Sequence, residues 1–300
     1  MFKKISRRFR EHCRFACRRF RRHQRIFRGD LFNPDLSDAW SSSLLALRKH
    51  GYCKLPGSLF SHEILTALKS NSLDARVHEM VEFYTSAFEC ILQDDKGTLA
   101  FNKYGKLSFN LDDSLWGNCE ASFLKDLHLL LSGYYNQDYW VRNPPQLVLD
   151  SASHREQDYG QSFYHLDWGF HQISLIVLLN STSTGSTCTR VIKGSHRFVH
   201  FLYEIPWLGG GDRYSFLTRM FAGFLESMLG TVDLVGEAGA CFLVDAGNSF
   251  HRAVYGLDRA MIHFNFAIDE SYLSSIDYAS KLTRTYLSRK NLSEFISRSR

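Results

Sequence analysis

The stretch SFYHLDWGFHQISLIVLL, residues 162–179, predicts two short β-strands and contains the most informative side chains of the chain. Its apolar runs, 162–167 and 172–179, have the length expected of strands, and the second is apolar enough to be buried on both faces. On an extended chain, His165 and Asp167 leave the same face while Leu166 points the other way. Two metal-binding side chains can therefore reach one ion from a single element.

Both strands and helices are predicted around this stretch. Further strands are expected at 146–150, 188–192, 231–235, 239–245 and 260–268, with an amphipathic helix beginning near Phe216 and stopping at Gly230. The first half is predicted to be mostly helical: helices over 36–50, from Ser61, over 77–91 and over 120–132, with a short strand and turn at 51–57. Helices followed by many short antiparallel strands indicate an α+β domain with a sandwich or jelly-roll core, here residues 29–300.

Charge separates the first 28 residues from the rest. They hold 12 of the 36 Lys/Arg and one acid, a net +11, whereas the remainder has 24 basic and 30 acidic residues, a net −6. Apolar residues from Phe2 to Phe20 recur every three or four positions, which predicts a basic amphipathic helix. We expect this arm, residues 1–28, to contact an anionic membrane surface; phosphates of a nucleic acid, an organelle-targeting role and a solvated arm are alternatives. The acidic remainder argues against nucleic-acid binding.

Cysteine usage and hydropathy indicate the compartment. Seven scattered cysteines without a CxxC pair are typical of free thiols in a reducing environment. No apolar run reaches the roughly 18 residues of a membrane-spanning helix. The expectation is a cytoplasmic protein, soluble or peripheral to a membrane.

A third metal-binding residue follows 84 positions after His165. His251 comes just after the predicted strand 239–245 and its turn, where it can enter from a neighbouring strand. Two imidazoles and one carboxylate are the ligand set of the facial triad, which leaves positions open on Fe(II). Arg259, eight residues further on, is suited to grip a dicarboxylate bidentately.

Four segments, in order, resemble the phytanoyl-CoA dioxygenase family of Fe(II)/2-oxoglutarate-dependent oxygenases. They are GYCKLPG at 51–57, YHLD at 164–167, VIKGSHR at 191–197, and EAGACFLVD at 237–245 followed by NSFHR at 248–252. The chain departs from the family at Lys193, where a proline is common, and in the spacing of Arg259, since the family's arginine usually lies slightly further past the histidine.

The resemblance implies a double-stranded β-helix (jelly roll) with N-terminal helices packed on it, and an enzyme that hydroxylates a small molecule with dioxygen. Aromatic residues in the insert 198–230 favour a lipid-like substrate, and a helical lid packed on the barrel is the alternative. His165, Asp167 and His251 would hold Fe(II), and Arg259, or alternatively Arg252, would bind 2-oxoglutarate. Three other residues are candidates for lining or supporting the site: His196, Trp168 and His263. The rival interpretations are a non-catalytic jelly-roll binding module anchored by its arm and a nucleic-acid-modifying oxygenase.

Overall fold

The computed structural model describes residues 34–69, 92–93, 101, 103–111, 113–136, 139–141, 144–156, 163–167, 172–198 and 216–267. The basic arm 1–28, the helix expected over 77–91 and the candidate site residue Trp168 lie outside these residues. No helix among the described residues is long and apolar enough to cross a membrane.

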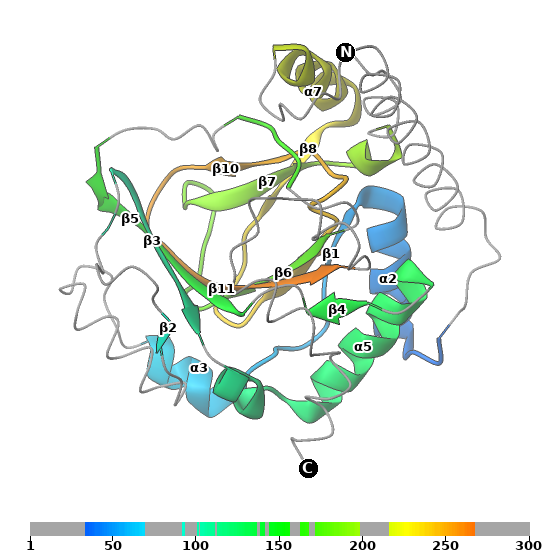
Figure 1. Cartoon of the computed structure of the whole chain (residues 1–300), viewed down its shortest axis with the longest axis vertical. Coiled ribbons are helices and arrows are strands. Elements are labelled where there is room, and N and C mark those ends of the chain that lie inside the picture. The colour runs from blue at the N-terminus through cyan, green and yellow to red at the C-terminus, as the bar shows by residue number, and fades with distance from the viewer. Residues whose placement is uncertain are drawn as a thin grey trace, which may run out of the picture.

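Two antiparallel sheets face each other (Figure 1). The larger contains eight strands, in spatial order β1 (Tyr52–Lys54), β9 (Cys241–Val244), β6 (Ile173–Leu178), β11 (Arg259–Ala267), β5 (Gln146–Arg155), β3 (Tyr104–Leu111) and β2 (Leu92–Gln93), while β4 (Trp140–Val141) also pairs with β11. The smaller contains β10 (His251–Val254), β7 (Cys188–Ile192) and β8 (Thr231–Leu234) in that order. Strands distant in sequence thus become neighbours.

The central strands of the larger sheet are buried on both faces, as the apolar run at 173–179 predicts. Leu175 and Val177 of β6 belong to the core under the helices, whereas Ile176 and Leu178 face the second sheet. The same alternation in β11 places its phenylalanines on the helical side. Its residues 259, 261 and 263 therefore point into the space between the sheets.

Helices cover the outer face of the larger sheet (Figure 1): α2 (Asp38–His50), α3 (His62–Lys69) and α5 (Ala121–Tyr135), with a 3-10 turn, η1 (Asp113–Asn118). Gly51 ends α2 in the left-handed conformation, φ 76°, and its N–H donates to the carbonyl of Leu47. The predicted end of this helix at Gly51 is confirmed.

On the opposite side of the molecule, α7 (Phe216–Leu229) packs against the smaller sheet and against residues 163–167. Its buried residues Ala222 and Leu225 contact a cluster that includes Tyr164, Leu166 and Phe250. A further 3-10 turn, η3 (Ser195–Arg197), follows β7. The helix predicted to stop at Gly230 is confirmed.

Two local predictions were wrong. Residues 163–167 form no strand; they contribute an isolated bridge, His165 to His251, and then an irregular segment. The first half also contains a strand that was not predicted, the eight-residue β3. In β3, Leu107, Phe109 and Leu111 are buried and alternate with more accessible residues, the period of two that a half-buried strand shows.

Candidate metal site and adjoining cavity

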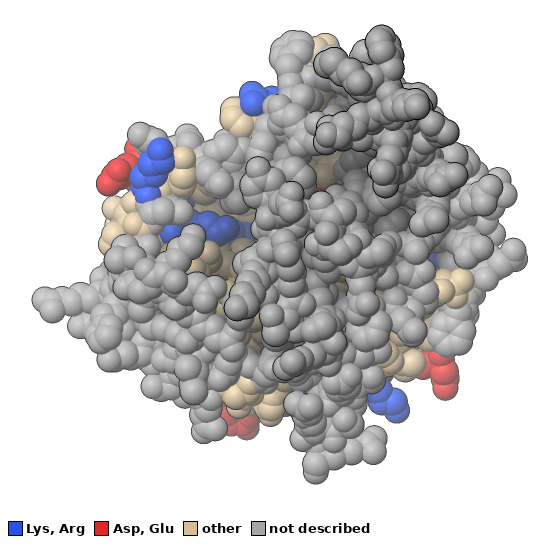
Figure 2. All heavy atoms as spheres, in the orientation of Figure 1, with Lys and Arg blue, Asp and Glu red and all other residues tan. Residues whose placement is uncertain are grey.

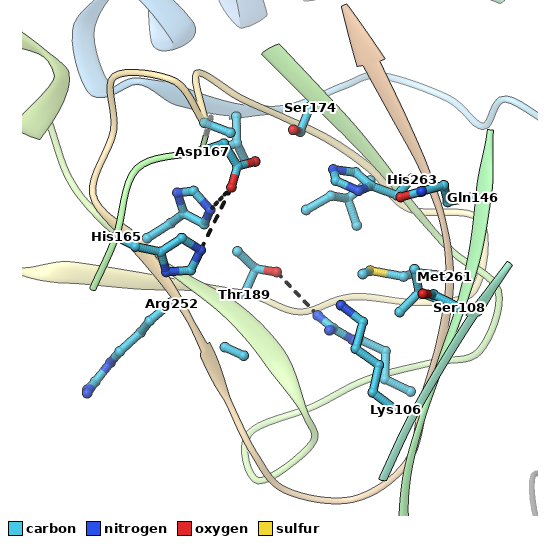
Figure 3. Close-up of a pocket in the computed structure, with 17 residues that line it drawn as sticks. Lys106, Ser108, Gln146, His165, Asp167, Ser174, Thr189, Arg252, Met261 and His263 are labelled. Atoms are coloured by element: carbon cyan, nitrogen blue, oxygen red, sulfur yellow. Dashed lines mark hydrogen bonds and ion pairs between the residues drawn. The ribbon is translucent and has the colours of Figure 1, made fainter. Parts of the chain in front are cut away.

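His165, Asp167 and His251 converge at one end of a cavity between the two sheets (Figure 3). The carboxylate oxygen Oδ1 of Asp167 lies 3.4 Å from Nε2 of His251 and 3.8 Å from Nε2 of His165. One ligand atom from each of the three side chains lies within 4.8 Å of the others. The three residues predicted to meet do meet, and they form a set that can hold a metal ion.

Backbone pairing brings the two histidines together. The N–H of His165 donates to the carbonyl of His251 at 3.0 Å, and the N–H of His251 donates back at 3.1 Å. His251 is the first residue of β10, so one ligand stands on a sheet strand. Asp167 is fixed separately, because its N–H donates to the carbonyl of Ala246 at 2.9 Å in the turn before His251. A single backbone bridge therefore brings the two histidines together without a continuous strand at 163–167.

Both imidazoles are oriented by a carbonyl two residues earlier in the chain. Nδ1 of His165 lies 3.0 Å from the carbonyl oxygen of Phe163, and Nδ1 of His251 lies 3.0 Å from that of Ser249. A carbonyl can only accept, so each Nδ1 carries the proton and donates it. Nε2 of each ring is therefore the atom that can bind a metal ion, and without a metal a proton on Nε2 can interact with Asp167 instead.

The second oxygen of Asp167 is held by an amide. Gln172 Nε2 donates to Oδ2 at 3.0 Å and to Asn265 Oδ1 at 2.8 Å, and the Ser174 hydroxyl donates to the same amide oxygen at 2.8 Å. This arrangement leaves Oδ1 directed at the histidines. Burial by itself would raise the pKa of Asp167, but the imidazoles, His251 above all, hold it well below its ordinary value. The carboxylate is therefore ionised at neutral pH.

Cationic side chains occupy another part of the cavity wall. Arg259, 4% exposed, donates from Nε and Nη2 to Asp150 Oδ2 at 2.9 and 2.7 Å, and from Nη1 to the Thr189 hydroxyl at 3.2 Å. Lys106 of β3 points into the same space (Figure 3), where burial lowers the pKa of its ammonium group. With Lys106 protonated, two positive groups face one carboxylate, so this part of the cavity can accept an anion.

Arg252, the alternative to Arg259, points away from the cavity centre (Figure 3). Its guanidinium lies 4.6 Å from the centre of the Tyr164 ring and 3.8 Å from the carboxylate of Glu226. Only Arg259 therefore presents its charge alongside Lys106.

The two other histidines singled out from the sequence differ in position. His263 lines the cavity on the same strand face as Arg259 and Met261, as predicted, and burial lowers its pKa to about 4, so the ring is neutral. His196 is fully buried outside the cavity lining, with Nε2 3.0 Å from the carbonyl of Arg48. Its contacts join the turn after β7 to the end of α2, which is a structural role.

Sequence reasoning missed Lys106, Asp150 and Gln172. Lys106 belongs to the strand that was overlooked, although the alternation in KLSFNL, residues 106–111, was the available signal. Asp150 ends the predicted strand 146–150. Its pairing with Arg259 depends on the register between β5 and β11, in which these two residues lie opposite each other. Nothing in the sequence marks Gln172.

Comparisons with known proteins yield structural neighbours alone. No model of a known protein family matches the chain, and no curated protein matches it. Among solved structures, EctD from S. alaskensis with 2-oxoglutarate and 5-hydroxyectoine is 14% identical, over 79% of this chain and 78% of that one, with a TM-score of 0.48. The non-heme alpha ketoglutarate dependent epimerase SnoN from nogalamycin biosynthesis is 13% identical, over 76% and 83%, TM-score 0.48. The carbocyclase SnoK is 12% identical, over 82% and 94%, TM-score 0.44.

Proposed function

We propose that the chain is an Fe(II)- and 2-oxoglutarate-dependent oxygenase that hydroxylates a small molecule, built on a double-stranded β-helix. The observation that carries the proposal is the convergence of His165, Asp167 and His251 at one end of a cavity whose wall also holds Lys106 and Arg259. A metal-ligand set beside a cationic patch suits a keto acid with a second carboxylate.

The spacing of the three donors fits an octahedral ion. Donors bound at about 2.1 Å lie about 3 Å apart when at right angles and about 4.2 Å apart when opposite. The carboxylate-to-imidazole separations of 3.4 and 3.8 Å fall between these limits. For all three donors to occupy one face, the two carboxylate-to-imidazole separations would shorten by about 0.4 and 0.8 Å, and the other three positions would be left for non-protein ligands.

Arg259 and Lys106 would bind the distal carboxylate of 2-oxoglutarate. Arg259 has five N–H groups, and its contacts with Asp150 and Thr189 use three of them, which leaves two for a ligand. Asp150 fixes the guanidinium in place before the ligand arrives, so little side-chain freedom is lost on binding. The ligand carboxylate, placed next to Lys106, would also favour the protonated form of the lysine, which burial disfavours.

Fe(II) with bound 2-oxoglutarate would supply oxidative decarboxylation coupled to attack on an unactivated C–H bond. The chain itself contributes orientation and shielding. Gln172 holds the Asp167 carboxylate in one rotamer, the paired backbone fixes the two histidines, and Val148, Ile176 and Met261 restrict water in the cavity. Asp167 as an ionised ligand favours hydroxylation over halogenation, because halide would need that position open.

The cavity has room for such a ligand. Its volume is about 130 Å³, whereas a single water needs about 10–15 Å³ by the same measure. Polar groups line it as well as apolar ones, among them Ser108, Gln146 and Ser174. A small organic acid can therefore be accommodated and hydrogen-bonded.

The test is an anaerobic titration followed by a turnover assay. The wild-type protein should bind one equivalent of Fe(II) and then 2-oxoglutarate, and a metabolite-pool screen should reveal compounds that stimulate succinate formation. His165→Ala and Asp167→Ala should abolish both metal binding and substrate-dependent succinate. A protein that binds neither Fe(II) nor 2-oxoglutarate would be a non-catalytic binding module instead.

A further inference from the structure

The outward face of α7 is apolar although it faces solvent. The buried residues Thr218, Ala222 and Leu225 fix which side packs against the protein. On another side of the helix, Met220, Phe224 and Met228 are 56%, 60% and 50% exposed, and they follow one another at intervals of four residues. Residues four apart lie one above the other on a helix, so these three form a continuous stripe.

The other flank of α7 contacts the segment that leads to the metal site. Phe163 is 46% exposed, and the guanidinium of Arg219, on α7, lies 4.3 Å from the centre of its ring. Of the six large apolar side chains that are exposed among the described residues, three form the stripe; we call them the α7 face (Met220, Phe224 and Met228). Side chains of this size, about half exposed, present roughly 300 Å² together, an apolar patch of the size that is often functional on a protein surface.

Basic side chains adjoin the far end of the helix. The N–H of Lys193 donates to the carbonyl of Gly230, the residue that follows α7, at 3.1 Å, and the N–H of Gly194 donates to the carbonyl of His50 at 2.8 Å. Lys49 and Arg197 are exposed beside them. The pKa of His50 is lowered, first by burial and then by Lys49, Arg197 and Lys193. Lys49, Lys193 and Arg197 thus form one cationic cluster around the His50 ring.

Figure 2 shows the distribution of charged side chains on one face of the molecule. At the upper edge of the molecule, where Figure 1 places α7, the described residues that are visible are basic or uncharged. An apolar stripe has Arg219 at one end and a cationic cluster at the other. This arrangement matches an anionic bilayer, where apolar side chains reach the boundary of the acyl chains and basic side chains contact the phosphate headgroups. Nucleic acid offers phosphates but no apolar surface for Met220 and Met228.

We propose that the α7 face and the cationic cluster together dock the protein on an anionic membrane surface. The stripe lies at the depth of the acyl boundary, and the cluster contacts phosphate headgroups. Tyr164, which donates to Glu226 of α7 at 2.7 Å, precedes His165, so the docked helix also holds the metal-site segment close to the membrane. The proposal does not depend on the reaction that the site performs.

The test is co-sedimentation of the full-length chain with vesicles of two parts phosphatidylcholine to one part phosphatidylserine, and with vesicles of phosphatidylcholine alone. The parent should bind the anionic vesicles more tightly. The triple variant Met220→Ser/Phe224→Ser/Met228→Ser should bind at least tenfold more weakly. Its matched control, Leu45→Ser/Leu257→Ser, removes two exposed apolar residues that lie away from α7 and should bind as the parent does.

The cluster is tested by Lys49→Glu/Arg197→Glu. Each basic group near an anionic surface contributes roughly a fivefold factor, so removing two and adding two acids predicts binding to anionic vesicles that is at least about 25-fold weaker. The control Lys103→Glu/Lys125→Glu changes two exposed lysines elsewhere by the same charge. Circular dichroism and thermal unfolding confirm that each variant is folded.

Three results would overturn the proposal. The parent could fail to bind anionic vesicles, or the α7 triple variant could bind them as tightly as the parent, which would assign any binding to another part of the chain. Alternatively, the triple variant could convert a dimer to a monomer in sedimentation velocity without altering vesicle binding, which would make the α7 face a contact between copies of the chain.

Discussion

Replacing Lys106 with methionine separates ligand binding from stability, because the structure predicts opposite effects on the two. Lys106 and Arg259 carry two positive charges against one negative charge on Asp150, so the substitution takes the local charge from +1 to 0 when the lysine is protonated. A hydrogen bond to a charged group contributes about 1.5–3 kcal/mol. Its loss should weaken 2-oxoglutarate binding about 12- to 160-fold.

Stability should move the other way or stay the same. Burial lowers the pKa of Lys106, which means that the folded protein without ligand disfavours its charge. Methionine has a similar length and no charge to desolvate, so Lys106→Met should raise the melting temperature of the ligand-free protein or leave it unchanged. A loss of binding together with a gain in stability is not expected of a merely structural residue.

The assay is anaerobic calorimetry of the Fe(II)-loaded protein with 2-oxoglutarate, with thermal unfolding of the same samples. Lys103→Met is the control, since Lys103 precedes the same strand but is exposed. It should bind 2-oxoglutarate as the wild type does. A Lys106→Met protein whose dissociation constant stays within twofold of wild type would refute the assignment of the cationic part of the cavity.

Further predictions concern the second oxygen of the metal carboxylate, the end of α2 and pH. Gln172→Leu removes the amide that holds Asp167 Oδ2 and should weaken Fe(II) binding about 10- to 100-fold in a titration; unchanged affinity would exclude this positioning role. Gly51→Ala places a Cβ 2.2 Å from a hydroxyl oxygen at φ +76° and should cost about 2–4 kcal/mol in urea unfolding. Gly185→Ala, at φ +96° with nothing within 4 Å, should cost only about 1–2 kcal/mol, and equal losses would contradict the packing argument. Affinity for 2-oxoglutarate should be highest below the lowered pKa of Lys106 and fall as pH rises through it, a dependence that Lys106→Met should abolish.

The sequence predicted the elements with the strongest periodicity. Gly51 after a helical repeat, Gly230 after α7 and the continuous apolar run of β6 all correspond to observed boundaries within one or two residues. Each depends on local chemistry: a residue that can adopt positive φ, or a strand buried on both sides. The strand β3 was missed because its alternation is short and contains lysine and asparagine.

The metal residues could be predicted from their types and order, but their support could not. His165 and His251 pair through backbone atoms, which carry no sequence signal. The contacts of Gln172 with Asn265, 93 residues away, and of Arg259 with Asp150, 109 residues away, depend on strand register. Long-range polar contacts of this kind are set by the assembled sheets, and only the structure reveals them.

The most direct measurement is a crystal structure of the full chain grown anaerobically with Mn(II) as a stand-in for Fe(II), recorded with anomalous scattering. We predict one strong anomalous peak about 2.0–2.2 Å from Nε2 of His165, Oδ1 of Asp167 and Nε2 of His251. A peak elsewhere, or no peak at this position with the metal present in excess, would contradict the account.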